Sequence, residues 1–110
     1  MLYRHVFEAT GRWLGEAFEV HLANGHSSSG VLMVESPTSA DAVSRLLSVG
    51  KEAAIEVQCF GSGVLLLTVG QDSVEVPPDP NFEAWTLTLE DGEMFVAVPG
   101  GGVTHWSPRA

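Results

Sequence analysis

Short segments in which apolar and polar residues alternate run through most of the chain, and this period of two predicts β-strands. The clearest example covers residues 18–22, where Phe, Val and Leu alternate with Glu and His, as in a strand with one buried face. Asn24-Gly25 follows, and this pair suits a tight hairpin turn because both residues tolerate positive φ. We therefore expect residues 30–35 to return as the second strand of a hairpin.

The alternation resumes after residue 52 and continues to the end of the chain. Asp91-Gly92 is a second hairpin signal, and Pro77-Pro78 should end a strand because neither proline can donate to a ladder. Residues 64–69 are almost all apolar, which predicts a strand covered on both faces. The expected strands are 55–59, 64–69, 74–76, 82–89, 94–98 and 103–106.

One helix is predicted, near residues 38–49. Thr38 and Asp41 have a spacing similar to that of a capping box, and Ser39 is an alternative N-cap. Gly50 is placed to follow the helix in the left-handed conformation that glycine adopts easily. One face carries the apolar residues Ala40, Val43, Leu46 and Leu47.

These elements predict a single domain over residues 1–110 of the α+β class, mostly β. Because most connections are short, we expect an antiparallel meander of about seven to eight strands, curled into a roll or partial barrel. The helix should cover one open face. Residues 1–10 and 107–110 are expected to be loosely ordered, although Val6 and Phe7 could begin a short strand.

Composition narrows the classes of function. Five basic and fourteen acidic residues give a net charge of −9, which argues against binding to nucleic acid or to an anionic membrane. The same charge favours a basic protein partner. Cys59 is the single cysteine, so an intrachain disulfide and a cysteine-rich zinc site are excluded. Because the sequence has no signal-peptide pattern and no long apolar run, we expect a cytoplasmic protein. We expect no cofactor.

Rare aromatic residues lie close to turn residues in segments 79–85 and 99–106. Four residues of these segments are candidate ligand-binding residues: Glu83, Trp85, His105 and Trp106. If residues 82–89 form a regular strand, Glu83 shares a face with Trp85. Its carboxylate is then either hydrogen-bonded to a backbone N–H or to the Trp85 indole, or exposed at the end of the strand. The alternative is a polar group inside a pocket, with a raised pKa. Pro99-Gly-Gly-Gly102 is followed by strand formers rather than a helix, so we interpret it as a turn where backbones approach closely.

The remaining candidate chemistry is sparse. His21 and His26 could face each other across a hairpin, with Glu19 nearby, but two histidines straddling a turn are more typical of an exposed hairpin than of a metal site. Cys59 alternates with apolar residues and is expected to be a core residue. We therefore assign no catalytic and no metal-binding residues.

Acidic residues gather in the second half of the chain. They form either a solvated surface that resists aggregation or a docking face that steers a basic protein. The candidate partner-binding residues are Glu75, Asp79, Glu90, Asp91 and Glu93.

The C-terminal half of the chain resembles a small bacterial family of domains of unknown function. The shared pattern is a strand ending at prolines (Val76 to Pro80), then Phe82-Glu-Ala-Trp85, a hairpin, Pro99-Gly-Gly101 and Trp106. Residues 1–50 match in their layout of a hairpin followed by a helix. The resemblance implies no established activity.

Three hypotheses follow for the function. The first is a non-enzymatic interaction domain that binds a basic partner, as an immunity protein neutralises a toxin. The second is a roll that binds a small ligand in a pocket near Trp85 and Trp106. The third is a hydrolase that uses Glu83 and His105, which requires these side chains to lie within about 3 Å of each other, directly or through one water.

Overall fold

The protein folds into one curled antiparallel sheet with a helix along one side, as seen in a computed structural model that describes residues 1–24 and 29–107. The α+β class, mostly β, is confirmed. The sheet has nine strands in the order β6-β5-β4-β1-β2-β3-β7-β8-β9. The elements are β1 (Tyr3–Leu14), β2 (Ala17–Ala23), β3 (Gly30–Val34), α1 (Pro37–Leu47), β4 (Ala53–Cys59), β5 (Leu65–Val69), β6 (Asp72–Val76), β7 (Trp85–Leu89), β8 (Met94–Ala97) and β9 (Val103–Trp106).

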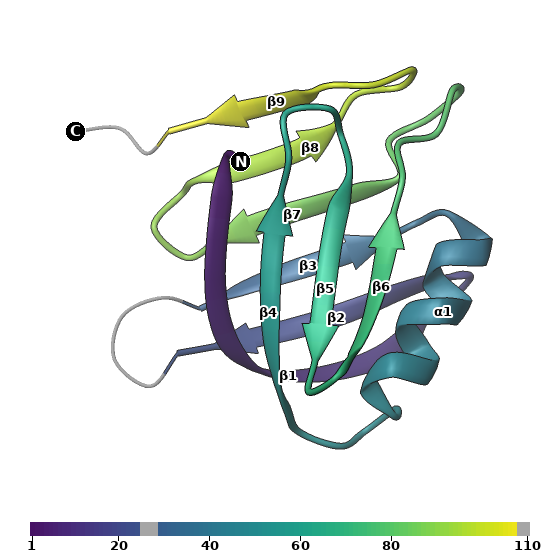
Figure 1. The fold of residues 1–110 in the computed structure, drawn as a ribbon, viewed down its shortest axis with the longest axis vertical. Helices are drawn as coiled ribbons and strands as arrows, with labels where there is room; N and C mark the ends of the chain where they lie inside the picture. Colours follow the sequence, from purple (N-terminus) through teal and green to yellow (C-terminus); the bar gives the residue numbers. More distant parts are fainter. Residues whose placement is uncertain (25–28, 108–110) are drawn as a thin grey trace.

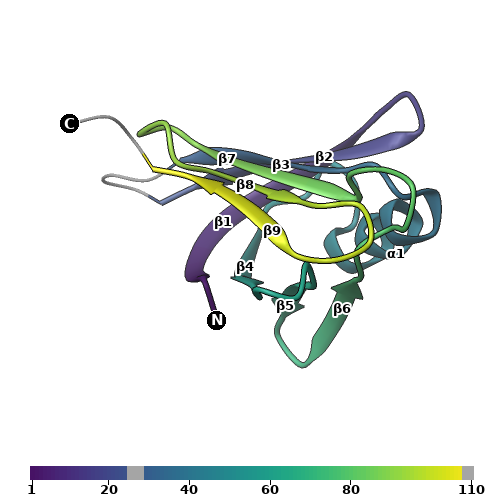
Figure 2. The same cartoon turned by 90° about the horizontal axis from the view of Figure 1, so that it is seen from above.

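The long strand β1 joins two layers of this sheet. Its first half, from Tyr3 to Ala9, pairs with β4, and its second half, from Glu8 to Leu14, pairs with β2. Figure 1 shows β4, β5 and β6 crossing in front of β2, β3, β7 and β8, with β1 bending from one group to the other. Figure 2 shows the two groups as separate layers, with α1 closing one side between them. The sheet is therefore an open sheet that curls back on itself.

The hydrophobic core fills the space between the layers and follows the alternation in the sequence. Residues of even number in β2 and β3 point inward, and those of odd number in β4, β5 and β7 do the same. Helix α1 adds the buried side chains of Ala40, Val43 and Leu47. The largest fully buried side chains are Trp85, Phe7, Phe18 and Phe95.

The arrangement of the strands differs from the expected meander in four respects. There are nine strands rather than seven to eight, and residues 3–10 belong to β1 rather than to a loose terminus. Strands β4 to β6 follow α1 and pair on the far side of β1, so that β3 pairs with β7. The apolar strand β5 lies next to the sheet edge, and its Leu66 is only partly buried. These differences come from pairings between strands distant in sequence.

The helix starts and ends earlier than the predicted range of 38–49. Its N-cap is Ser36, which makes no side-chain capping hydrogen bond, so the N-caps predicted at Thr38 and Ser39 are wrong. Pro37 occupies the first turn, where its missing N–H costs nothing and its fixed φ suits a helix. After Leu47 the chain leaves the helix at Ser48, whose φ of 53° is positive. No helix in the described residues is long and apolar enough to cross a membrane.

Two turns and the start of β7, all distant in sequence, meet at one corner of the two layers. The indole Nε1 of Trp85 donates a hydrogen bond to the carbonyl of Gly63 at 2.9 Å. The backbone N–H of Gly102 donates to the carbonyl of Ser62 at 2.8 Å. A Cβ on Gly63 would lie 2.9 Å from the carbonyl oxygen of Gly102, so the predicted close approach of backbones in the Pro99–Gly102 turn is confirmed. Most of the aromatic and glycine motif therefore builds this corner.

Candidate functional site

The two tryptophans of the predicted ligand pocket lie on opposite faces of the sheet. Trp85 is completely buried in the core, on the inner face of β7. Trp106 pairs in register with Met94 of β8, and both side chains point to the other face, away from the buried Phe95. Since 51% of Trp106 is exposed, the two indoles do not line a common pocket.

Glu83 lies outside the strand in which it was expected. Strand β7 begins at Trp85, and Glu83 is an exposed residue of the preceding loop. The predicted strand, 82–89, starts three residues too early, because Ala84 and Trp85 are both buried and break the period of two. Leu87 of β7 lies two strands from His105 in register, and Glu83 stands four residues before Leu87, in the loop that precedes the strand. The structure therefore does not bring Glu83 and His105 together.

His105 instead belongs to a small aromatic cluster at the end of β8 and β9. Its ring stacks on Phe95 with centroids 4.2 Å apart and an interplanar angle of 8°. Its Nε2 lies 3.4 Å from Oε2 of Glu93. Tyr3 packs against Phe95, with ring centroids 5.1 Å apart. Burial, followed by the charge of Glu93, raises the pKa of Tyr3 to about 12. The cluster anchors β9 to the inner face.

The hairpin of β1 and β2 carries a charged cluster on its outer face. Oε1 of Glu19 accepts hydrogen bonds from Nε of Arg12 at 2.7 Å and from Nε2 of His21 at 2.8 Å. These two bonds, that from Arg12 first, hold the pKa of Glu19 below its usual value. His26, which was predicted to face His21 across the Asn24-Gly25 turn after β2, lies outside the described residues. Within the described ranges, no group of three or more His, Cys, Asp or Glu residues could hold a metal ion.

The five candidate acidic residues divide between two ends of the molecule. Glu75 lies on the edge strand β6, and Asp79 lies in the loop that follows, where its Oδ1 accepts the N–H of Asn81 at 2.8 Å. Both views show the β6–β7 connection at the opposite end from the turn between β7 and β8. That turn holds the other three residues, which we call the acidic turn: Glu90, Asp91 and Glu93.

The outer face of β2, β3, β7, β8 and β9 is the most extensive candidate surface. Figure 2 shows β2, β3 and β7 as the upper layer, with α1 and β4 to β6 on the other side of the sheet. In register, one row of side chains crosses all five strands, and a second row runs beside it. The first row is His21, Val31, Thr88, Met94 and Trp106; the second is Glu19, Met33, Thr86, Val96 and Thr104.

This outer face is apolar in the middle and charged at its margin. Val31, Met33 and Met94 are partly exposed, although no described element covers them. A shallow hollow of about 560 Å³ opens at one end, between His21 on β2 and Glu90 of the acidic turn. Glu90 also accepts a hydrogen bond from the hydroxyl of Ser29 at the start of β3. The face therefore joins an apolar centre to carboxylates held at its rim.

The sequence carries a signal for this face in strands β3 and β8. Strands β3 and β8 are apolar at almost every position, with no alternation. Such strands are normally covered on both faces, yet here they belong to an antiparallel sheet with one uncovered face. The partly exposed Val31, Met33 and Met94 could be identified from this mismatch between the apolar pattern and the expected exposure.

Comparison with known protein families identifies the family of this chain. The model of a family of unknown function, DUF6188, matches residues 13–107. The chain belongs to this family. No curated protein and no solved structure matches it.

The DUF6188 match begins near the end of β1 and continues through β9. It therefore includes every residue of the two outer-face rows and the whole acidic turn. The family resemblance that the C-terminal motifs indicated is confirmed, and it extends further toward the N-terminus than those motifs.

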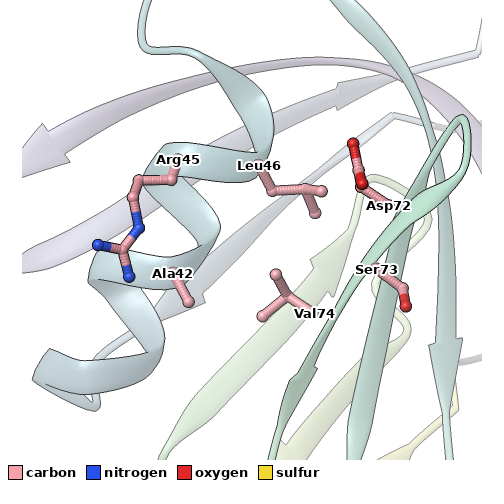
Figure 3. A pocket seen from close by; sticks show the side chains of 6 residues that line it. All are labelled: Ala42, Arg45, Leu46, Asp72, Ser73 and Val74. Atoms are coloured by element: carbon pink, nitrogen blue, oxygen red, sulfur yellow. The ribbon is translucent and has the colours of Figure 1, made fainter.

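A second pocket of this DUF6188 member, of about 340 Å³, lies where α1 meets β6. Figure 3 shows Leu46 of the helix and Val74 of the strand pointing toward each other, with Ala42 beside them and Asp72 at the end of the strand. Arg45 at its rim is paired with Asp41 on the same helix at 3.0 Å. The helix thus lies along the edge strand β6 and covers part of that edge.

Proposed function

We infer that this domain is a non-enzymatic interaction module of the cytoplasm that binds a basic protein through its outer face. The observation that carries the inference is an uncovered sheet face with an apolar centre, namely Val31, Met33, Met94 and Trp106, beside the acidic turn. Tryptophan and methionine are enriched in the centres of protein interfaces, and exposed apolar patches mark interaction sites.

The size of this face suits the centre of an interface. Two rows across five strands span about 24 Å by 14 Å, or roughly 340 Å². A stable complex buries about 800 Å² on each partner. The apolar rows would therefore form the dry centre, and the surrounding polar rim, including the acidic turn and the Arg12–Glu19–His21 cluster, would supply the remaining area.

Charge supports a basic partner. The net charge is −9, and Asp91 and Glu90 of the acidic turn are exposed at the margin of the apolar rows. Carboxylates in this position accelerate the encounter with a positively charged surface and disfavour acidic competitors. Small acidic immunity proteins, which neutralise basic toxins, are one class of bacterial protein with this character.

The test is co-expression with the products of neighbouring genes, followed by affinity measurement for any product that co-purifies. Trp106→Ala should weaken binding at least about tenfold, as the loss of a central interface tryptophan does. Phe82→Ala is the matched control, because Phe82 is 40% exposed but lies in the loop before β7. It should change the affinity less than about twofold.

Charge reversal provides a second matched pair. Glu90→Lys and Glu75→Lys change the net charge equally, but Glu90 lies in the acidic turn and Glu75 lies on β6 at the other end. Association should slow more for Glu90→Lys. The assignment of this face would be refuted if the two variants in each matched pair had equal effects on binding. It would also be refuted if no product of a neighbouring gene bound the protein.

A further inference from the structure

Strand β9 is a short edge strand of four residues that lacks the other usual kinds of protection. Natural sheet edges are blocked by lysine, by proline, by bulges or by a covering element. The other edge, β6, has α1 alongside it. Strand β9 reads Val-Thr-His-Trp, with neither lysine nor proline, and Figure 1 shows no described element on its free side. Its row of unpaired backbone groups is therefore open to another strand.

The hydrogen-bond phase identifies which residues face this open edge. Val98 N–H donates to the carbonyl of Gly102 at 2.9 Å where β8 leads into β9. Pairs in an antiparallel ladder alternate between hydrogen-bonded and non-hydrogen-bonded, and the register continues through Thr104 opposite Val96. Thr104 and Trp106 therefore use their backbone groups on β8. Val103 and His105 direct their N–H and C=O groups outward.

We propose that β9 binds an extended, basic segment of the partner, which adds as a tenth strand to the sheet. The proposal rests on the proposed function and specifies how the partner is held. Main-chain hydrogen bonds to Val103 and His105 would provide affinity, as in other complexes formed by strand addition. Side chains on one face of the added strand would extend the outer-face row that ends at Trp106.

The basic character of the segment follows from what surrounds the end of β9. Trp106 pairs with Met94, which follows directly after the acidic turn. Glu93 lies 3.4 Å from His105, so a carboxylate stands beside the next-to-last residue of the edge strand. The indole of Trp106 is half-exposed, and its ring face attracts the positive charge of a lysine or arginine side chain. A second copy of this chain, itself at −9, fits this charge poorly.

The first experiment uses a synthetic heptapeptide of alternating lysine and valine, capped at both ends, and the intact protein. Binding is followed by the chemical shifts and hydrogen exchange of backbone amides. The amides of Val103 and His105 should become protected on binding, whereas those of Thr104 and Trp106 are protected beforehand by β8. The same peptide methylated on alternate backbone nitrogens, and its glutamate counterpart, should bind at least tenfold more weakly.

The second experiment changes the edge itself. His105→Pro removes the outward N–H, at an edge position where proline is tolerated, while His105→Ala removes the same side chain and keeps that N–H. His105→Pro should bind the peptide at least tenfold more weakly than His105→Ala. Val103→Pro with Val103→Ala repeats the comparison should His105→Pro fail to fold, as judged by its thermal transition.

The outcomes separate this proposal from the proposed function. A partner that binds and depends on Trp106, without protection of the Val103 and His105 amides, would refute strand addition and leave the outer-face interaction standing. The proposal would be overturned if the methylated and unmethylated peptides bound with equal affinity or if neither bound. It would also be overturned if sedimentation showed that the free protein is a dimer formed through β9.

Discussion

The hydrogen bond from the Trp85 indole to Gly63 should be a main determinant of stability. Trp85 is completely buried, and its Nε1 donates to the Gly63 carbonyl at 2.9 Å, which ties β7 in one layer to the β4–β5 turn in the other. Trp85→Phe keeps an aromatic ring in the core but removes the donor. The perturbation therefore isolates one polar contact and a small change in volume.

The size of the effect follows from two losses. A buried carbonyl left without its donor costs about 1–3 kcal/mol. Phenylalanine buries two fewer carbons than tryptophan, which costs about 1.6 kcal/mol at ~0.8 kcal/mol for each. The free energy of unfolding should thus fall by about 3 kcal/mol, which lowers Tm by roughly 12 °C for a domain of this size.

Urea unfolding and thermal scans of both variants measure this effect. Trp106→Phe is the matched control, because the same chemical change is made on a side chain that is 51% exposed. It should change the free energy of unfolding by less than about 0.5 kcal/mol. If Trp85→Phe were no more destabilising than Trp106→Phe, the hydrogen bond to Gly63 would contribute nothing and the account of the corner would be wrong.

Three further predictions concern the corner, the charged cluster and the thiol. Gly63→Ala should lower the free energy of unfolding in urea by more than about 2 kcal/mol, because the φ of Gly63 is +100° and the backbone of Gly102 blocks a Cβ. A Cβ on Gly61 meets no atom within 4 Å, so Gly61→Ala should leave the free energy of unfolding nearly unchanged. The pKa of Glu19 is lower in the folded protein than in the unfolded chain. Its contribution to stability is therefore present above the pKa of the unfolded state and is lost as the pH falls through the pKa of the folded state. Glu19→Gln should therefore destabilise the protein more at neutral pH than at about pH 3, and an equal loss at both would contradict this. Burial raises the pKa of Cys59 to about 12, so a thiol reagent should label it only as the protein unfolds, and rapid labelling of the native protein would refute its burial.

Local patterns predicted the elements well, because side-chain period reports which face is buried. The alternation of Phe18, Val20 and Leu22 gave β2 correctly, and Ala40 with Val43 gave the buried face of α1. Turn chemistry also succeeded where glycine was required by close backbone approach. These features depend on neighbours in the sequence.

The pairing of distant strands could not be predicted in this way. Strand β1 was hard to recognise, because Gly11 lies on its inner face under the ring of Phe18, so that no large side chain marks the alternation there. Glu83 was expected on a strand face but lies in the loop before β7, because the buried Ala84 directly precedes the buried Trp85 that begins the strand. Of the candidate site, the acidic turn and Trp106 could be proposed from sequence, but their shared position depended on the order β7-β8-β9.

The position of β1 between two layers has a consequence for how the chain folds. Strands β1, β2 and β3 can pair as soon as they leave the ribosome, but Phe7 must wait for Ile55, and Leu32 must wait for Leu87. Pairings over such separations slow folding, toward the millisecond-to-second range of β-rich domains. During synthesis the N-terminal hairpins would therefore present two unsatisfied apolar edges until β4 and β7 arrive, and this early intermediate is the species most exposed to aggregation and to chaperones.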